Sequence, residues 1–322
     1  MNMQNQFNCI LIKNKKILVA GGNGFIGTNI CLKLYKDNKI TIIDSEYSST
    51  NKRDFWKSKN VKYIHESIQN YEFPKFCEYD IIINLACIAS QPLYQKEPLY
   101  TMDTCYNGTK RLLEFMRKDT IFLQASTSEI YGESLNEIQY ESDRGNVNCY
   151  GPRSCYDEGK RIAETLCYEW LKKGYNTKIV RIFNTYGPHM SLQDGRIIPN
   201  LISQALQNKP LTIYGDGCQT RSFQYIDDLI DGIISLILSN INSPINIGNP
   251  EEITINELVD IIKHELNLPE EYPIEHKCLP QDDPTHRKPG IIKAQTLLNY
   301  HPKIKIKQGI QNTIQWIKNT IT

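Results

Sequence analysis

Apolar and polar positions in the first half of the chain form short apolar runs that alternate with longer segments of helical repeat. The apolar runs predict buried strands at residues 16–20, 40–44, 61–64, 80–85, 120–125 and 177–181. A repeat of about 3.6 residues predicts helices between them, at residues 26–35, 107–117 and 156–172. Buried strands that alternate with amphipathic helices are typical of a parallel sheet covered on both faces. We therefore predict an α/β fold with a Rossmann-like, doubly wound parallel sheet.

The composition excludes several classes of protein. The chain has 322 residues, of which 40% are hydrophobic and 23% charged, as in a globular protein with one large or two smaller cores. A net charge of +1 gives no reason to expect nucleic acid or an anionic membrane as partner, and no apolar run approaches the roughly 20 residues of a membrane span. The ten cysteines are scattered without metal-ligand spacing, so we predict no metal site and free thiols in a reducing, cytoplasmic compartment.

A glycine-rich turn joins the first predicted strand to the first predicted helix. Glycines at positions 21, 24 and 27 allow the backbone to approach a pyrophosphate at the helix N-terminus, where free amides and the helix dipole favour negative charge. The sequence therefore predicts a dinucleotide site at this turn. Its residues are Gly21, Gly24, Phe25, Ile26 and Gly27, with Leu85 and Ala86 at the end of the strand at 80–85.

Asp44 ends the second predicted strand. A carboxylate at that place can accept hydrogen bonds from the adenosine ribose and repels a 2′-phosphate, which favours NAD. Lys52 and Arg53 follow closely and keep NADP as an alternative cofactor.

Tyr156 and Lys160 lie four residues apart, on one face of the predicted helix at 156–172. An ammonium group beside the phenol lowers its pKa toward neutrality, so Tyr156 can take a hydroxyl proton while a nicotinamide takes the hydride. Thr127, Ser128 and Glu129 follow the strand at 120–125, at the edge where open α/β sheets place their chemistry. We predict that Thr127 bridges Tyr156 and the substrate oxygen, and that Glu129 acts as a base.

The alternation of strands and helices ends near residue 186, which divides the chain into two predicted units. Beyond this point Pro, Gly and Asp become frequent and the apolar runs shorten. We expect residues 16–186 to form the NAD-binding domain and residues 187–322 to form mainly a smaller substrate-binding domain, with some segments returning to the first. Residues 1–15 begin with a polar stretch that lacks the regions of a signal peptide, so we expect a disordered lead.

Five segments together resemble the extended short-chain dehydrogenases that act on nucleotide sugars. They are ASTSEIYG at residues 125–132, GPRSCYDEGKR at 151–161, RIFNTYGP at 181–188, QTRSFQY at 219–225 and DDPTHRKP at 282–289. The similarity runs from about residue 16 to 301 and is closest to the UDP-glucuronate decarboxylases. It implies a UDP-sugar substrate and a homodimer paired through two helices per subunit. The residues implied to bind the substrate are Asn184, Arg196, Tyr214, Arg221 and Arg287.

One segment departs from the decarboxylase pattern. The resemblance implies the pattern Pro-x-Lys-Thr-x-Lys-Thr-Asn on a helix that faces the sugar, whereas this chain has PLYTMDTC at residues 98–105. The loop at 87–92 also lacks the proline-rich version of that family. Asp103 stands where a cation is expected, and a buried carboxylate there repels a sugar C6 carboxylate. The departure therefore favours a sugar with a neutral C6 hydroxymethyl group.

We accordingly expect a redox-neutral lyase: a UDP-hexose 4,6-dehydratase, with UDP-N-acetylglucosamine as the favoured substrate. Oxidation at C4 acidifies the C5 proton, Glu129 removes it and C6 hydroxide leaves. In the ordinary 4,6-dehydratases that this segment resembles, the sequence is Thr-Asp-Glu and its Asp serves as the C6 acid. This chain has Ser128 in place of that Asp, so Asp103 and Cys105 are the candidate C6 acids. Such a rearrangement also allows inversion at C5, as in similar enzymes of large viruses. The alternatives are a UDP-glucuronate decarboxylase that makes UDP-xylose, and a non-catalytic nucleotide-sugar-binding protein.

Overall fold

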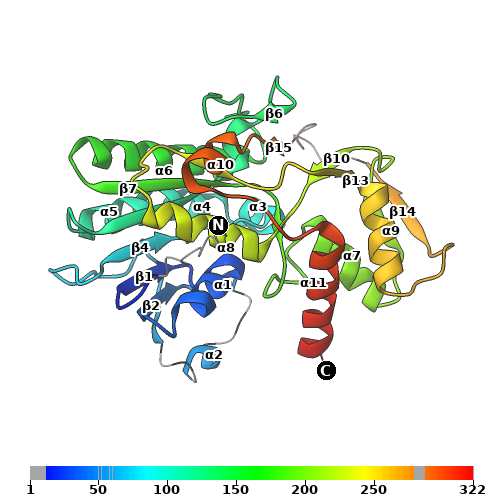
Figure 1. The fold of residues 1–322 in the computed structure, drawn as a ribbon, viewed down its shortest axis with the longest axis horizontal. Helices are drawn as coiled ribbons and strands as arrows, with labels where there is room; N and C mark the ends of the chain where they lie inside the picture. Colours follow the sequence, from blue (N-terminus) through cyan, green and yellow to red (C-terminus); the bar gives the residue numbers. More distant parts are fainter. Residues whose placement is uncertain are drawn as a thin grey trace, which may run out of the picture.

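A parallel sheet forms the centre of the larger part of the molecule (Figure 1). The computed structural model describes residues 12–49, 51, 53–57, 59, 61–278 and 287–321. Within these ranges the sheet has seven strands in the order β12-β7-β5-β4-β1-β2-β3, all paired in parallel. The strands are β1 (Lys16–Ala20), β2 (Lys39–Asp44), β3 (Lys62–His65), β4 (Ile81–Asn84), β5 (Ile121–Thr127), β7 (Asn176–Ile182) and β12 (Ile245–Ile247). The predicted α/β class and doubly wound sheet are confirmed.

Alternate residues of the strands pack into two different cores. In β1, Ile17 and Val19 belong to the core on one face of the sheet, whereas Leu18 and Ala20 belong to the core on the other. Helices α1 (Phe25–Leu34) and α8 (Ile226–Leu238) cover the first face, and α5 (Thr109–Phe115) and α6 (Ser154–Lys172) cover the second. Because both faces are buried, the central strands β1 and β4 are almost wholly apolar rather than alternating.

Several short elements lie outside the central sheet. They are α2 (Asp54–Lys57), α3 (Gln91–Lys96), α4 (Pro98–Asp103), the π-helix η1 (Thr104–Gly108), the 3-10 helix η2 (Ser128–Tyr131) and the short pair β6 (Ile138–Gln139) and β15 (Lys288–Pro289). The sequence predicted one helix at 107–117, but helical structure already begins at Pro98. It runs through α4 and η1 into α5.

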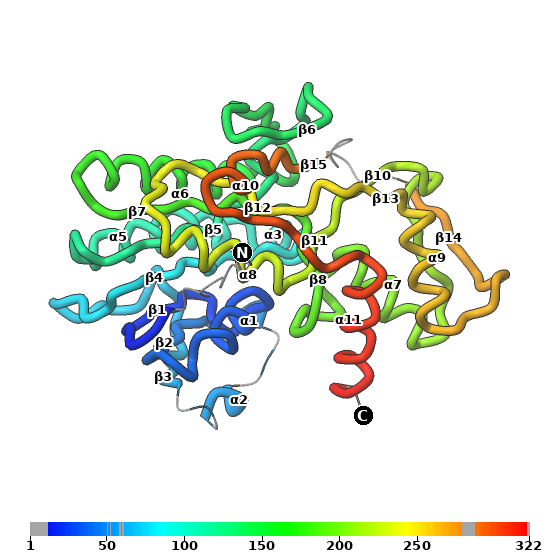
Figure 2. Tube along the Cα trace, in the orientation of Figure 1, coloured from blue at the N-terminus to red at the C-terminus, as the bar shows by residue number. Residues whose placement is uncertain are grey.

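A smaller unit lies beyond the carboxyl edge and occupies the right side of Figure 1. It contains α7 (Ile197–Leu206), β9 (Leu211–Tyr214), β10 (Thr220–Ser222), β13 (Glu252–Thr254), α9 (Ile255–Glu265), β14 (Ile274–Lys277) and α11 (Ile306–Ile321). The pair β8 (Thr185–Tyr186) and β11 (Gln224–Tyr225) lies between the two units. Figure 2 shows the chain returning to the large sheet through α8, β12 and α10 (Ile292–Leu298).

The segment before β1 is packed against the domain where the structure describes it. Ile12 is buried, and the backbone amides of Asn14 and Lys15 donate to the Asp37 carbonyl and the Asn38 side chain. Residues 12–15 are therefore ordered, unlike the disordered lead that we expected. The expectation was drawn from the polar residues at the start of the chain and did not consider the apolar contact of Ile12. Residues 1–11 of that lead lie outside the described residues. Among the described helices, none is long and apolar enough to span a bilayer.

Candidate active site

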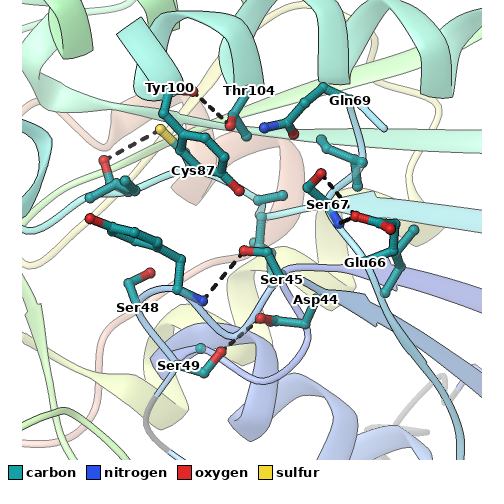
Figure 3. Close-up of a pocket in the computed structure, with 18 residues that line it drawn as sticks. Asp44, Ser45, Ser48, Ser49, Glu66, Ser67, Gln69, Cys87, Tyr100 and Thr104 are labelled. Atoms are coloured by element: carbon teal, nitrogen blue, oxygen red, sulfur yellow. Dashed lines mark hydrogen bonds between the residues drawn. The ribbon is translucent and has the colours of Figure 1, made fainter. Parts of the chain in front are cut away.

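The glycine-rich turn leads from β1 into α1 and forms part of a pocket at the carboxyl edge of the sheet (Figure 3). Gly21 has a φ of +72°, a conformation that a side chain disfavours, and a Cβ there would lie 2.8 Å from the Ala86 amide. A Cβ at Gly27 would lie 2.2 Å from the Gly21 carbonyl oxygen. Helix α1 begins at Phe25, directly after Gly24, so its free amides are available to a pyrophosphate.

We expect Gly27 to be required for folding and Gly24 for NAD binding, and an alanine substitution at each position can separate the two roles. We expect Gly27→Ala to destabilise the fold by about 1–3 kcal/mol, because its Cβ collides with backbone. A Cβ at Gly24 meets its nearest atom at 3.5 Å, so Gly24→Ala is expected to fold normally. It should weaken NAD binding by at least about tenfold, because Gly24 lines the pocket. Urea unfolding and calorimetric NAD titration check the pair; equal losses of stability in both variants would contradict the assignment.

Asp44 lies in the wall of the pocket and is held by three donors. Its carboxylate accepts hydrogen bonds from the backbone amides of Asn23 at 2.9 Å and Glu46 at 2.8 Å, and from the Ser49 hydroxyl at 2.7 Å. Arg53 is ion-paired with Glu46, Nε to Oε1 at 3.1 Å, and Lys52 lies outside the described residues. The fixed carboxylate favours the free ribose of NAD over a 2′-phosphate.

The remaining walls of the pocket fit a dinucleotide. Leu85 and Ala86 form one side after β4, and Ser67, Ile68 and Gln69 form another after β3. In the described part of the chain the buried Oε1 atom of Gln69 has no hydrogen-bond partner, so it is available to an adenine amino group. Figure 3 shows Cys87, Tyr100 and Thr104 on one side of the pocket, and Asp44 with Ser49 on the other. Of the predicted cofactor residues, Gly21, Gly24, Asp44, Leu85 and Ala86 line it.

Tyr156 and Lys160 are both buried on α6, beside the end of β5. The Lys160 ammonium donates to the Ala125 carbonyl at 3.0 Å and lies 5.6 Å from the centre of the Tyr156 ring. The Thr127 side chain lies beside the Tyr156 hydroxyl. Burial raises the pKa of Tyr156 to about 12, although Lys160 and Thr127 both lower it. Lys160 thus lowers the phenol pKa in the predicted direction, but in this structure burial outweighs it. A near-neutral phenol in the working enzyme stays a prediction.

Tyr94 of α3 packs flat on Tyr156 and was missed by the sequence analysis. The two ring centres are 5.1 Å apart and the ring planes differ by 4°. This stack fixes the plane of the Tyr156 ring. A helix of six residues is too short to show a helical repeat, so the sequence pattern did not predict α3 or this stack.

Glu129 is held between two guanidinium groups. It lies on η2 and forms ion pairs with Arg153 of the loop before α6 and with Arg287, whose Nη2 is 3.1 Å from Oε2. Arg287 also donates to the Ser128 carbonyl at 2.8 Å. Burial raises the pKa of Glu129, but the two arginines lower it by more than burial raises it, so the pKa lies below its ordinary value. Glu129 is therefore a poor proton acceptor, contrary to its predicted role as C5 base.

The residues predicted as C6 acids occupy different environments. Asp103 is half-exposed at the end of α4 and accepts a hydrogen bond from the exposed Asn107 side chain. Tyr100 and Thr104 of the same helical segment line the pocket, whereas Asp103 is not among its lining residues. Cys105 is buried in η1, with its Sγ 3.4 Å from that of Cys87. The predicted repulsion between Asp103 and a sugar carboxylate is therefore not supported, because Asp103 is partly solvated and accepts a hydrogen bond from Asn107.

The predicted substrate residues are divided between the two units. Arg196 donates to the Ala89 carbonyl at 3.1 Å, and its charge acts on Glu129 and Tyr156. Arg287 lies against Glu129, as described above. Asn184 is half-buried before β8, whereas Tyr214 and Arg221 lie on β9 and β10 of the smaller unit. Arg287 belongs to the motif DDPTHRKP at residues 282–289, of which residues 282–286 lie outside the described residues.

Comparison with known proteins identifies the family. Residues 17–248 match the model of the NAD dependent epimerase/dehydratase family. The curated UDP-glucuronic acid decarboxylase 1 of Danio rerio is 41% identical over 319 residues, which cover 95% of this chain and 73% of that protein. UDP-glucuronic acid decarboxylase 3 of Arabidopsis thaliana is 41% identical over 92% of this chain and 87% of its own length. The chain belongs to the NAD-dependent epimerase/dehydratase family.

Solved structures agree with this assignment. A UDP-N-acetylglucosamine 4-epimerase from Methanobrevibacter ruminantium M1, in complex with UDP-N-acetylmuramic acid, has a TM-score of 0.86 and 26% identity, covering 96% of this chain and 100% of that one. A UDP-glucuronic acid 4-epimerase from Bacillus cereus, in complex with UDP-glucuronic acid and NAD, has a TM-score of 0.83 and 28% identity, covering 95% and 99%. The protein is thus an enzyme of the extended short-chain dehydrogenase type that acts on nucleotide sugars, and its cofactor is NAD.

The predicted 4,6-dehydratase activity is wrong. The curated relatives that match almost the whole chain at about 40% identity are UDP-glucuronic acid decarboxylases. The prediction depended on Asp103 facing the sugar and on Glu129 acting as a free base, and the environments of both residues argue against it.

Proposed function

We propose that this enzyme decarboxylates UDP-glucuronic acid to UDP-xylose. The observation that carries the proposal is Glu129 in its two ion pairs with Arg153 and Arg287. Dehydration needs a base that removes the C5 proton, and a carboxylate with a lowered pKa between two guanidinium groups is poorly suited to that task. Decarboxylation needs no such base. Once C4 is a ketone, the C5–C6 bond breaks, carbon dioxide leaves and the electron pair of that bond forms an enolate with the C4 oxygen. The enolate then takes a proton from water at C5.

The charges around Glu129 also suit a substrate with a carboxylate. Arg153, Arg196 and Arg287 all act on Glu129 and lower its pKa. Burial raises the pKa of the neighbouring Asp157 to about 7, so that this acid is only partly charged near neutrality. Arg196 is ion-paired with Asp194. The excess positive charge therefore comes from Arg153 and Arg287, which share the single carboxylate of Glu129. An anionic sugar therefore finds cationic partners here.

The redox part of the reaction is assigned to Thr127, Tyr156 and Lys160. Tyr156 takes the proton of the C4 hydroxyl and returns it when C4 is reduced again, while the adjacent Thr127 orients the phenol. The neighbouring Cys87 and Tyr156 outweigh burial and raise the pKa of Lys160, which remains charged and stabilises the phenolate. The glycine turn and Asp44 would hold NAD, which would supply the hydride acceptor for C4.

The test is to offer the NAD-loaded enzyme UDP-glucuronic acid, UDP-glucose and UDP-N-acetylglucosamine separately, and to weigh the products by mass spectrometry. We expect UDP-glucuronic acid alone to react, with loss of one carbon dioxide and appearance of UDP-xylose. An epimer of unchanged mass, loss of water from either neutral sugar, or no reaction with any of the three would refute the proposal.

Asp103 provides a second check on the same proposal. Because its carboxylate is half-exposed and bonded to Asn107, we expect Asp103→Asn to leave the turnover of UDP-glucuronic acid within about twofold of the original. A rise of tenfold or more in affinity for UDP-glucuronic acid would mean that Asp103 does face the sugar.

We also propose a symmetric homodimer formed through α5 and α6, which lie side by side in Figure 1. Several large apolar side chains on α6 and on the adjoining α4 and η1 are exposed in the single chain: Leu99, Met102, Tyr106, Ile162 and Tyr168. Light scattering is expected to give the mass of two chains. The double substitution Tyr106→Glu, Tyr168→Glu should give one chain, whereas Tyr150→Glu, on an exposed loop, should not change the mass. A monomeric wild type would exclude the dimer.

A further inference from the structure

Two cysteines that are far apart in sequence meet at the edge of the NAD pocket. Cys87 lies in the loop after β4, and Cys105 lies in the π-helix η1, with 3.4 Å between their Sγ atoms. Cys87 is partly exposed and lines the pocket, whereas Cys105 is only 2% exposed behind it. The pair therefore has one thiol that small molecules can reach and a second one in contact with it.

The surroundings divide the two thiols into different roles. The hydrogen bond with Cys105 lowers the pKa of Cys87 to about 7, and Lys160 lowers it as well, against the effect of burial. The same hydrogen bond, together with burial, raises the pKa of Cys105 well above its ordinary value. Near neutral pH Cys87 is thus substantially a thiolate, the reactive form of cysteine, and Cys105 holds its proton.

We propose that Cys87 and Cys105 form an oxidation site, at which a peroxide converts the two thiols to a disulfide that weakens NAD binding. The Cys87 thiolate attacks the peroxide, so that an S–O bond forms, the O–O bond breaks and hydroxide leaves. Cys105 then loses its proton and attacks the Cys87 sulfur, so that the S–S bond forms and the oxygen departs as water. Two electrons pass from the two sulfurs to the peroxide, and a dithiol reverses the reaction by exchange.

The disulfide has to move parts of the pocket. The sulfur atoms must approach from 3.4 Å to about 2.0 Å, which draws the loop after β4 toward η1. On one side of this loop, Ala86 abuts the glycine turn, where a Cβ at Gly21 would come within 2.8 Å of its amide. On the other side, Cys105 packs against α6, where a Cβ at Gly159 would come within 3.1 Å of its Sγ. A shift of about 1 Å in such a site is enough to lower binding or turnover tenfold or more.

The experiment treats the NAD-free enzyme with hydrogen peroxide and measures two quantities besides activity: the linked peptides by mass spectrometry and NAD affinity by calorimetry. We expect a peptide that joins Cys87 to Cys105, an NAD affinity reduced at least about tenfold, and recovery of both on addition of dithiothreitol. Because neither readout involves a sugar, the result is independent of the proposed decarboxylase activity. Absence of the linked peptide when the exposed Cys149 is already oxidised, or linkage without loss of NAD affinity, would overturn the proposal.

Two variants separate the roles of the thiols. Cys105→Ser should leave Cys87 as a sulfenic acid that dimedone captures, and Cys87→Ser should give no dimedone adduct at Cys105. As a matched control, the triple variant Cys149→Ser, Cys218→Ser, Cys278→Ser removes the three exposed thiols of the described chain and should respond to peroxide as the wild type does. An unchanged loss of NAD affinity in Cys105→Ser would show that the disulfide is not responsible.

Discussion

Replacing Tyr156 by Phe is expected to lower the turnover of UDP-glucuronic acid by at least about 10²-fold and to leave NAD binding intact. The phenol is buried on α6 beside Thr127, so its hydroxyl can exchange a proton with the C4 oxygen while its ring only fills space. Steady-state kinetics and calorimetric NAD titration of the purified variant measure the two effects separately.

Tyr94 provides the matched control for this substitution. Tyr94→Phe makes the same chemical change in the ring that stacks on Tyr156, and in the described chain its hydroxyl has no hydrogen-bond partner. We expect the turnover of Tyr94→Phe to stay within about threefold of the wild type. If Tyr156→Phe retains turnover comparable with that control, Tyr156 is not the group that transfers the proton.

Replacing Asp157 by Asn is expected to stabilise the fold at high pH and not at low pH. Burial and the charge of Glu129 raise the pKa of Asp157 from 3.8 to about 7, and within the described chain its Oδ1 has no hydrogen-bond partner. Between these two pKa values the folded state keeps a proton that the unfolded state has released, so the free energy of unfolding falls as pH rises. The loss is complete above about pH 7 and amounts to at most about 4 kcal/mol.

Urea unfolding at pH 4 and pH 8 tests this expectation. The gain in stability from Asp157→Asn should be about 1–4 kcal/mol larger at pH 8 than at pH 4. Glu169→Gln, which neutralises an exposed carboxylate of the same helix, should give a difference that hardly depends on pH. A pH-independent effect of Asp157→Asn would mean that Asp157 ionises normally in the folded enzyme.

Local spacing predicted the features of the site that depend on neighbouring residues. The glycines of the first turn follow one another closely, Asp44 directly ends a predicted strand, and Tyr156 and Lys160 lie four residues apart. The central strands were also visible in the sequence, because both faces of the sheet are buried and these strands are mostly apolar.

The features that the sequence did not reveal join distant parts of the chain. Arg153 and Arg287 reach Glu129 from 24 and 158 residues away, and Tyr94 stacks on Tyr156 from a separate short helix. Asp103 was misread for a related reason: its identity is visible in the sequence, but the direction in which it points depends on how α4 packs on α6. The depth of burial that raises the pKa of Tyr156 is also a property of the packed fold.

The strand β12 limits how this enzyme can be divided or recombined. It consists of residues 245–247, yet it pairs with β7 at the edge of the large sheet, with Ile245 opposite Val180. A fragment that stopped at residue 186 would leave β7 as an open, apolar edge, which invites aggregation. The chain also returns through α8 and α10, and Asp228 of α8 accepts hydrogen bonds from the Lys303 and Ile304 amides. Chimaeras with relatives of different sugar specificity therefore need several coordinated crossover points, because a single cut would separate strands that fold together.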